Sequence, residues 1–290
     1  NHTLFAYEIW KLDASKLWRK ELQKLFHQIV ETDNIQDANN ARLRMAQIYL
    51  SEGFTVEAGA MLDGINRIDP SFYRSAKLAA MRGAANFLLT RYTEAAKDFS
   101  ATELNNNKEV EYWRAVLSDL LGNSGQSYDY LAMNDDYISK YPPMFRQRLA
   151  IVAADRAISA NEYNVALKIF DSLHNDNLID SINVYINFLM AKISLSTGQE
   201  EAALENLDKL AEDIKHPFVR SRAEFTRIAH AMDNGMDKDK IIDRLERLRI
   251  TWHGDGLELR VLTLLGELYY EKKDYVNAMR TWNNGVSGFK

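Results

Sequence analysis

The sequence is poor in the residues that build disulfide-stabilised folds and tight turns. It contains no cysteine, 4 prolines and 13 glycines in 290 residues. The lack of cysteine excludes disulfide bonds, zinc–cysteine sites and a cysteine nucleophile. The scarcity of turn-forming residues excludes an all-β protein, which needs a turn about every ten residues. No apolar run approaches the roughly 18 residues that span a bilayer, so we expect no membrane insertion.

The overall composition is that of a folded and mildly acidic protein. Hydrophobic residues make up 46% and charged residues 27% of the chain, which excludes disorder. The net charge of −5 provides no global basic field, so we expect no direct nucleic-acid binding. The length predicts either two domains or one elongated array. A chain without cysteine fits the cytoplasm and the periplasm equally, and both remain open.

Small residues recur in pairs twelve positions apart along most of the chain. The second members follow one another at spacings of 37, 32, 39, 37, 38 and 37 residues, which predicts about seven structural repeats. Six pairs consist of small residues, and a seventh keeps the spacing but has a large second member: Ala46–Ala58, Gly83–Ala95, Ala115–Ser127, Ala154–Ala166, Ala191–Ala203, Gly266–Ala278 and Ala229–Ile241.

Each repeat reads as two helices. In the first complete repeat, residues 41–50 and 56–68 both carry apolar residues at helical spacing. The small pair allows two antiparallel helices to approach closely where they cross. Residues that tolerate a left-handed backbone stand where the first helix of a repeat should end, as Gly53, Gly122, Asn161, Gly198 and Gly235. The sequence therefore predicts an all-α protein.

The pattern resembles the tetratricopeptide repeat family over residues 39–290. The last repeat and the first repeat carry the resemblance, through Leu265, Gly266, Tyr269, Tyr275, Ala278 and Trp282, and through Ala46, Tyr49, Gly53, Ala58, Asp69 and Pro70. The resemblance implies a right-handed α-solenoid of about seven antiparallel helix pairs with a concave face. Ile241 replaces the usual alanine, which predicts a wider helix crossing in the sixth repeat.

The two ends of the chain differ from the repeats between them. Residues 1–38 are expected to form an N-terminal helical cap or a degenerate repeat, with an amphipathic helix at about 15–31, before the array at 39–290. Residues 4–12 are either a further helix or an extended lead-in. The final helix remains apolar, so either the native chain continues or this face binds something. Self-association would use Met279, Trp282, Val286 and Phe289.

A screen for catalytic and metal-binding motifs finds none. The six histidines show no metal-ligand spacing, and neither a glycine-rich phosphate loop nor a GxSxG elbow is present. The acids around Gly235 resemble a calcium loop, but Arg244 stands where that loop requires glutamate. The His-Gly-Asp-Gly segment at 253–256 is interpreted as a turn between repeats. We therefore expect no enzyme activity, no cofactor and no metal site.

The family resemblance implies that first helices line the concave face at fixed offsets from the small residue. Aromatic members of that face are either anchors for a partner or packing between repeats. Ala80 and Ala84 occupy positions where some family members clamp a carboxylate, so we expect no such clamp. The offsets select ten candidate partner-binding residues: Arg44, Lys77, Trp113, Arg148, Asp155, Tyr185, Phe188, Lys192, Arg227 and His230.

Two functions follow from these patterns. The first is a non-catalytic scaffold that binds a segment of a partner protein, or a peptide, in the concave groove. The alternative is a structural segment of a longer solenoid, which spaces domains or self-associates through its last helix.

Overall fold

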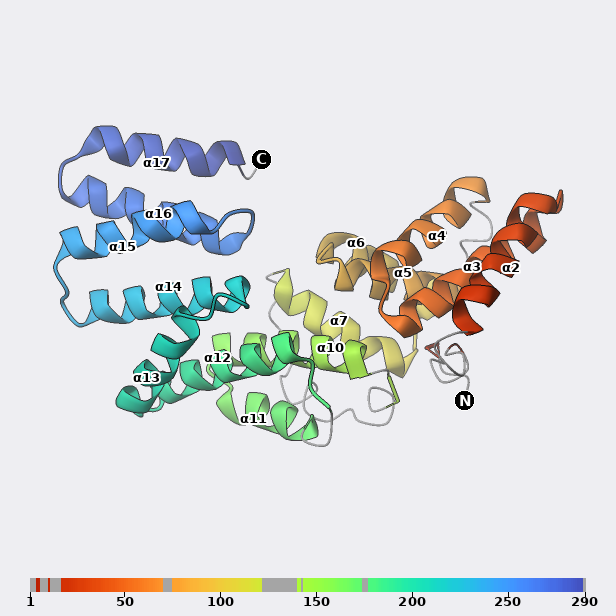
Figure 1. Ribbon diagram of the computed structural model, residues 1–290, viewed down its shortest axis with the longest axis horizontal. Helices are drawn as coiled ribbons and strands as arrows, with labels where there is room; N and C mark the ends of the chain where they lie inside the picture. The colour runs from red at the N-terminus through yellow and green to blue at the C-terminus, as the bar shows by residue number, and fades with distance from the viewer. Residues whose placement is uncertain are drawn as a thin grey trace. The chain divides into compact units, whose positions relative to one another are not determined.

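A computed structural model describes residues 4, 5, 10, 17–69, 75–121, 140, 141, 143–173 and 177–288. Every regular element in these residues is a helix (Figure 1), as the sequence predicts. The backbone contacts divide the chain into an N-terminal unit, residues 1–179, and a C-terminal unit, residues 180–290. The expected division into residues 1–38 and 39–290 stays a prediction.

The N-terminal unit is built from antiparallel helix pairs preceded by a single helix. Leu22 and Leu25 of that helix, α2, pack on Met45 and Ile48 of the next one. The expected partner of the helix α7, Lys108–Leu120, falls in residues 122–139, outside the described part of the chain. The helices are α2 Leu17–Glu31, the pair α3 Ile35–Glu52 and α4 Thr55–Ile68, the pair α5 Ala76–Leu88 and α6 Tyr92–Phe99, the short η2 Thr102–Leu104, then α7 Lys108–Leu120, and the pair α10 Pro143–Ser159 and α11 Tyr163–Ser172.

The C-terminal unit consists of three helix pairs in chain order. The two helices of each pair are joined by a tight turn, and each pair connects to the next at the opposite end (Figure 1). The pairs are α12 Asp180–Ser196 with α13 Glu200–Ala211, α14 Pro217–Asp233 with α15 Lys238–Thr251, and α16 Gly256–Glu271 with α17 Tyr275–Gly288.

The turns inside the described helix pairs are all of the same type. A residue with φ between 60° and 84° ends the first helix. At Gly53 its backbone N–H donates to Leu50, and the next N–H donates to Tyr49, so two free carbonyls of the helix end are satisfied. Glycine or asparagine stands at four of the turns, as predicted, whereas a threonine and a lysine stand at two others. The turn residues are Gly53, Thr90, Asn161, Gly198, Gly235 and Lys273, and the predicted turn at Gly122 lies outside the described residues.

Small residues on one helix receive large side chains from its partner. A Cβ added to Gly83 in α5 would lie 2.7 Å from the ring of Phe99 in α6. In the last pair, Gly266 of α16 receives the indole of Trp282 in the same way. The second small residues Ala58, Ala95, Ala166 and Ala278 are fully buried, as the repeat pattern predicts, and Ala203 is nearly so. At Gly83 and Gly266, these contacts account for the small residue of the pair.

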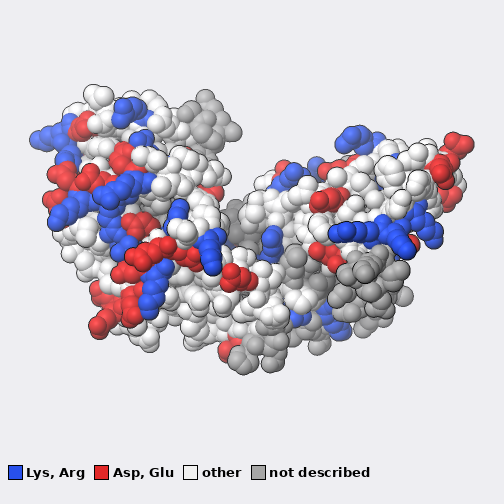
Figure 2. All heavy atoms as spheres, viewed as in Figure 1, with Lys and Arg blue, Asp and Glu red and all other residues white. Residues whose placement is uncertain are grey.

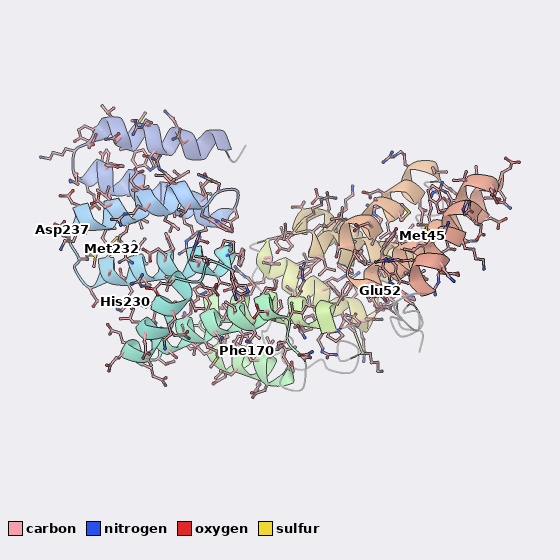
Figure 3. All side chains as sticks on the ribbon, viewed as in Figure 1. Met45, Glu52, Phe170, His230, Met232 and Asp237 are labelled. Carbon is pink, nitrogen blue, oxygen red and sulfur yellow. The ribbon has the colours of Figure 1, made fainter. Side chains whose placement is uncertain are left out.

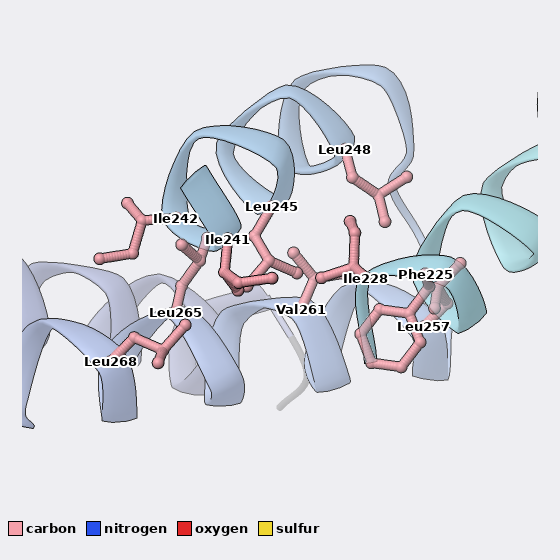
Figure 4. Packing of buried hydrophobic residues seen from close by; sticks show 10 residues of the cluster. All are labelled: Phe225, Ile228, Ile241, Ile242, Leu245, Leu248, Leu257, Val261, Leu265 and Leu268. Atoms are coloured by element: carbon pink, nitrogen blue, oxygen red, sulfur yellow. The ribbon is translucent and has the colours of Figure 1, made fainter. Parts of the chain in front are cut away.

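The sixth repeat keeps the helix pair but fills its interior differently. Ile241 is completely buried in a cluster with Ile228, Leu245, Val261 and Leu265, from α14, α15 and α16 (Figure 4). A large residue is therefore accommodated at this position. The wider helix crossing expected there stays a prediction.

Candidate partner-binding surface

In the N-terminal unit, Arg44 and Lys77 lie on α3 and α5. The Lys77 ammonium sits 5.8 Å from the centre of the Trp10 ring, a cation–π distance. Burial lowers the pKa of Lys77, and repulsion from Arg44 lowers it further. The two predicted cations therefore come together, and one of them contacts an aromatic residue of the chain's own N-terminal segment.

The Trp113 side chain is not exposed, so it forms no part of an accessible partner-binding surface, which corrects that expectation. Its side chain is completely buried in α7. It stacks on Phe99 with ring centres 5.2 Å apart and meets the edge of Phe87 at 5.3 Å. The alternative interpretation, packing between repeats, is the one that the structure supports for this residue.

Arg148 and Asp155 lie seven residues apart on α10. Arg148 is exposed and Asp155 is half-buried. Burial raises the pKa of Tyr92, and the negative charge of Asp155 raises it further, which indicates that this carboxylate lies near α6.

Four aromatic side chains form a continuous row in the C-terminal unit, which we call the aromatic ladder: Phe188, Tyr185, Phe218 and Trp252. Phe188 and Tyr185 of α12 stack with ring centres 5.8 Å apart. Phe218, in the first turn of α14, meets Tyr185 edge-on at 5.5 Å. Trp252, just after α15, meets Phe218 at 5.9 Å. Each step lies within the range of favourable aromatic pairs.

The outer part of the ladder is accessible and its inner end is not. Phe218 is 43% exposed, and Tyr185 and Trp252 are half-buried. Phe188 is only 4% exposed, so the prediction that it contacts a partner is corrected. Its ring instead supports Tyr185 and lies 5.8 Å from the Lys192 ammonium.

An arginine covers the middle of the ladder. The Arg222 guanidinium lies 3.4 Å from the ring centre of Phe218 and 5.5 Å from that of Trp252. Its Nη2 donates to Asp255 at 2.7 Å, and the indole Nε1 of Trp252 donates to the same carboxylate at 2.9 Å. The planar cation is thus held between two aromatic rings by one ion pair.

The carboxylate behind this arrangement also starts the next helix. Asp255 accepts a hydrogen bond from the backbone N–H of Leu257 and is the N-cap of α16. Partial burial alone would raise the pKa of Asp255, but hydrogen bonds from Trp252 and Arg222 outweigh it and hold the pKa below its usual value of 3.8. Gly254 has a φ of 94°, in the left-handed region that favours glycine. The His-Gly-Asp-Gly segment is thus a turn between repeats.

The start of α14 is fixed by a second set of polar contacts. Pro217 occupies the first helical turn, which suits a residue without a backbone N–H. The His216 ring binds Asp213 at 2.7 Å and Asp180 at 3.2 Å. The hydrogen bond that the His216 ring donates to Asp213, and the negative charge of both carboxylates, raise the pKa of His216 above its usual value. These contacts tie α12 to the α13–α14 connection, directly before Phe218.

Arg227 and His230 lie on α14 but outside the ladder. Arg227 forms ion pairs with Asp208 and Glu224, and the His230 ring contacts Glu200 at 2.9 Å. Figure 3 places His230 at the C-terminal end of α14, beside the turn to α15. Phe218 stands at the other end of the same helix. The structure therefore groups Tyr185 and Lys192 with the ladder and separates Arg227 and His230 from it.

Two ladder residues, Phe218 and Trp252, and the arginine that covers them, Arg222, were not selected from the sequence. The selected residues lie on first helices, whereas Phe218 lies in the first turn of α14 and Trp252 lies just after α15. One local signal was present. Phe218 and Arg222 stand four residues apart after a proline, on one face of the helix start.

The surface has charges of both signs. Figure 2 shows Lys and Arg side chains mixed with Asp and Glu over the face drawn, without a continuous basic surface. Among the described residues, no group of three potential metal ligands occurs. No described helix combines the length and the apolar character that crossing a membrane requires.

Comparison with known proteins gives structural likenesses only. No family model and no curated protein matches the chain. The chain is similar to a tetratricopeptide repeat protein from Parabacteroides merdae ATCC 43184, with 14% identity, 87% of this chain and 93% of that chain covered, and a TM-score of 0.49. It is also similar to the structure of Naa15/Naa10 bound to HypK-THB, with 14% identity and a TM-score of 0.28, over 92% of this chain and 49% of that chain.

At these identities and TM-scores, neither likeness indicates a ligand or a partner for this chain. Most of the described helices form successive pairs of one kind. They share the left-handed turn, and small residues lie buried where the two helices meet.

Proposed function

We propose that this protein is a non-catalytic scaffold that binds a segment of a partner protein on the aromatic ladder of its C-terminal unit. The observation that carries the proposal is the accessible row Tyr185, Phe218 and Trp252 with Arg222 stacked on it. Aromatic and arginine side chains supply most of the binding energy at protein interfaces.

The ladder suits binding because its side chains are already fixed. Arg222 is held by Asp255 and two rings, and Trp252 is held by the same carboxylate. Side chains that are ordered before binding lose little conformational entropy when a partner arrives. An accessible phenylalanine beside a fixed, planar cation favours a partner segment with apolar side chains and backbone carbonyls.

The test uses peptides selected by display of random sequences on the purified full chain. We expect Phe218→Ala and Arg222→Ala each to raise the Kd of the selected peptides at least about tenfold, which corresponds to about 1.4 kcal/mol. Arg222→Lys should weaken binding too, because a lysine keeps the charge but not the planar stack. The matched control is Phe26→Ala, since Phe26 is 57% exposed on α2 of the N-terminal unit. Phe26→Ala should bind the peptides like the wild type, and selected peptides that also bind all three Phe218 and Arg222 variants like the wild type would overturn the proposal.

A second candidate function is self-association through α17. Val276, Met279 and Val286 are 80%, 58% and 63% exposed, and their spacing places them along one side of the helix. Trp282 does not belong to that side, because its indole packs on Gly266 and Tyr270 within the pair. Phe289 lies outside the described residues.

Analytical ultracentrifugation over a range of concentrations tests this candidate. If α17 mediates association, the wild type should form a dimer or a larger species that Met279→Glu and Val286→Glu dissociate. Val56→Glu is the control, since Val56 is 65% exposed on α4. A wild type that remains monomeric at every concentration removes self-association.

A further inference from the structure

Three residues of the chain's N-terminal segment are buried against helices that lie far away in the sequence. Leu4, Phe5 and Trp10 are 9%, 3% and 1% exposed. The backbone N–H of Leu4 donates to Oε2 of Glu109 in α7 at 2.7 Å, across 105 residues of sequence. The segment is therefore bound to the N-terminal unit by tertiary contacts.

Phe5 occupies an aromatic pocket. Its ring centre lies 5.8 Å from Trp113, 5.4 Å from Tyr141 and 6.4 Å from Trp10. Trp10 in turn lies against the Lys77 ammonium of α5. Two aromatic side chains of the segment thus occupy neighbouring positions, and two residues predicted to bind a partner, Lys77 and Trp113, are among their contacts.

The backbone of the segment is held by a buried carboxylate. Glu109 is 3% exposed, and burial raises its pKa, against hydrogen bonds from the backbone N–H groups of Leu4 and Phe5 and from Tyr141 that lower it. The Tyr141 hydroxyl donates to Oε1 of Glu109 at 3.0 Å, and the Trp113 indole donates to that hydroxyl at 3.3 Å. A buried carboxylate is costly unless such donors satisfy it.

These contacts combine two elements of peptide recognition, main-chain hydrogen bonds and pockets for side chains. The hydrogen bonds to Glu109 provide affinity for a backbone, and the side-chain contacts provide selectivity. Here the pocket lined by Trp113 and Tyr141 selects a phenylalanine, and the position beside Lys77 selects a tryptophan five residues later.

We infer that this groove, lined by Lys77, Glu109, Trp113 and Tyr141, is a second binding site, for a partner segment with leucine and phenylalanine followed by tryptophan. Leu4, Phe5 and Trp10 of the chain itself occupy the site, so a partner binds there only by exchange with them. Because the groove lies in the N-terminal unit, this inference does not depend on the ladder proposed above.

The first experiment frees the groove in the full-length chain. The probe is a fluorescein-labelled peptide with the sequence of residues 1–12. A tethered segment competes at an effective concentration on the order of millimolar, so the wild type should bind the probe weakly. Phe5→Ala/Trp10→Ala should bind it at least tenfold more tightly by fluorescence anisotropy. Adding Glu109→Ala to this variant should reverse the gain, and a probe with both aromatic residues replaced by alanine should not bind.

The second experiment avoids any dependence on the folding of that variant. Residues 11–16 are replaced by a protease recognition sequence, the purified chain is cleaved, and the labelled probe is added. We expect the probe to displace the cleaved segment and to elute with the protein in size-exclusion chromatography. Two results would overturn the inference: a folded double variant that binds no more tightly than the wild type, or a cleaved protein that never exchanges its segment.

Discussion

Replacement by alanine should change the stability of the N-terminal unit in opposite directions at Gly83 and at Gly64. A Cβ at Gly83 would lie 2.7–2.8 Å from three carbons of the Phe99 ring. Phe99 has no room to retreat, since it is completely buried and stacks on Trp113. At Gly64 in α4, the nearest atom is Cδ of Arg42 at 3.8 Å, an ordinary contact with a flexible side chain.

The expected magnitudes come from two opposing effects. Replacing a glycine in a helix by alanine stabilises by about 0.5–1 kcal/mol. Overpacking a filled interior costs about 1–3 kcal/mol. Gly83→Ala should therefore destabilise the N-terminal unit by about 1–2 kcal/mol, whereas Gly64→Ala should stabilise it by about 0.5–1 kcal/mol.

Thermal unfolding of each full-length variant, followed by circular dichroism and tryptophan fluorescence, provides the measurement. For a unit of this size a change of 1 kcal/mol moves the Tm by about 2–4 °C. The Tm of Gly83→Ala should fall and that of Gly64→Ala should rise. If both variants shift in the same direction, the close contact between α5 and α6 is not the reason for the small residue at position 83.

Three further predictions concern a turn and two titrating groups. Thr90→Gly should stabilise the N-terminal unit by about 1 kcal/mol in denaturant unfolding, because Thr90 has a φ of 60°. Gly198→Thr should destabilise the C-terminal unit by a similar amount, because Gly198 has a φ of 84°. The raised pKa of His216 predicts stability of the C-terminal unit that is present below pH 6.5 and is lost as the pH rises through the folded pKa. His216→Gln should remove this dependence of the unfolding free energy on pH. The same pH dependence in the variant and in the wild type would contradict the assignment of the effect to His216. Burial raises the pKa of Glu109, so the free energy by which the wild type is more stable to unfolding than Glu109→Gln should shrink as the pH rises from 4.5. A stability difference that grows with pH would refute this prediction.

The helix pairs could be predicted from the sequence because their pattern is local. Glycine or asparagine at positions 53, 161, 198 and 235 predicts a turn with a left-handed backbone, and each of these turns is present. Thr90 and Lys273 adopt the same backbone without a local preference for it. Packing of the two helices against each other imposes the turn there, and that cause is not visible in a single residue type.

The candidate site was less predictable because it depends on which aromatic side chains remain accessible. Trp113 and Tyr185 were both selected as aromatic residues of first helices, yet Trp113 is completely buried and Tyr185 is not. The difference arises from neighbours far away in the sequence, among them Phe5 and Tyr141 around Trp113. The ladder joins α12, α14 and the α15–α16 turn, so its continuity exists only in the folded chain.

Hydrogen–deuterium exchange of the full chain, with and without a peptide selected on it, tests the central claim most directly. The proposal predicts slower exchange in residues 217–222 and 252–256, where Phe218, Arg222 and Trp252 lie. Exchange that slows only in other segments, with these two unchanged under saturating peptide, would show that the aromatic ladder is not the binding surface.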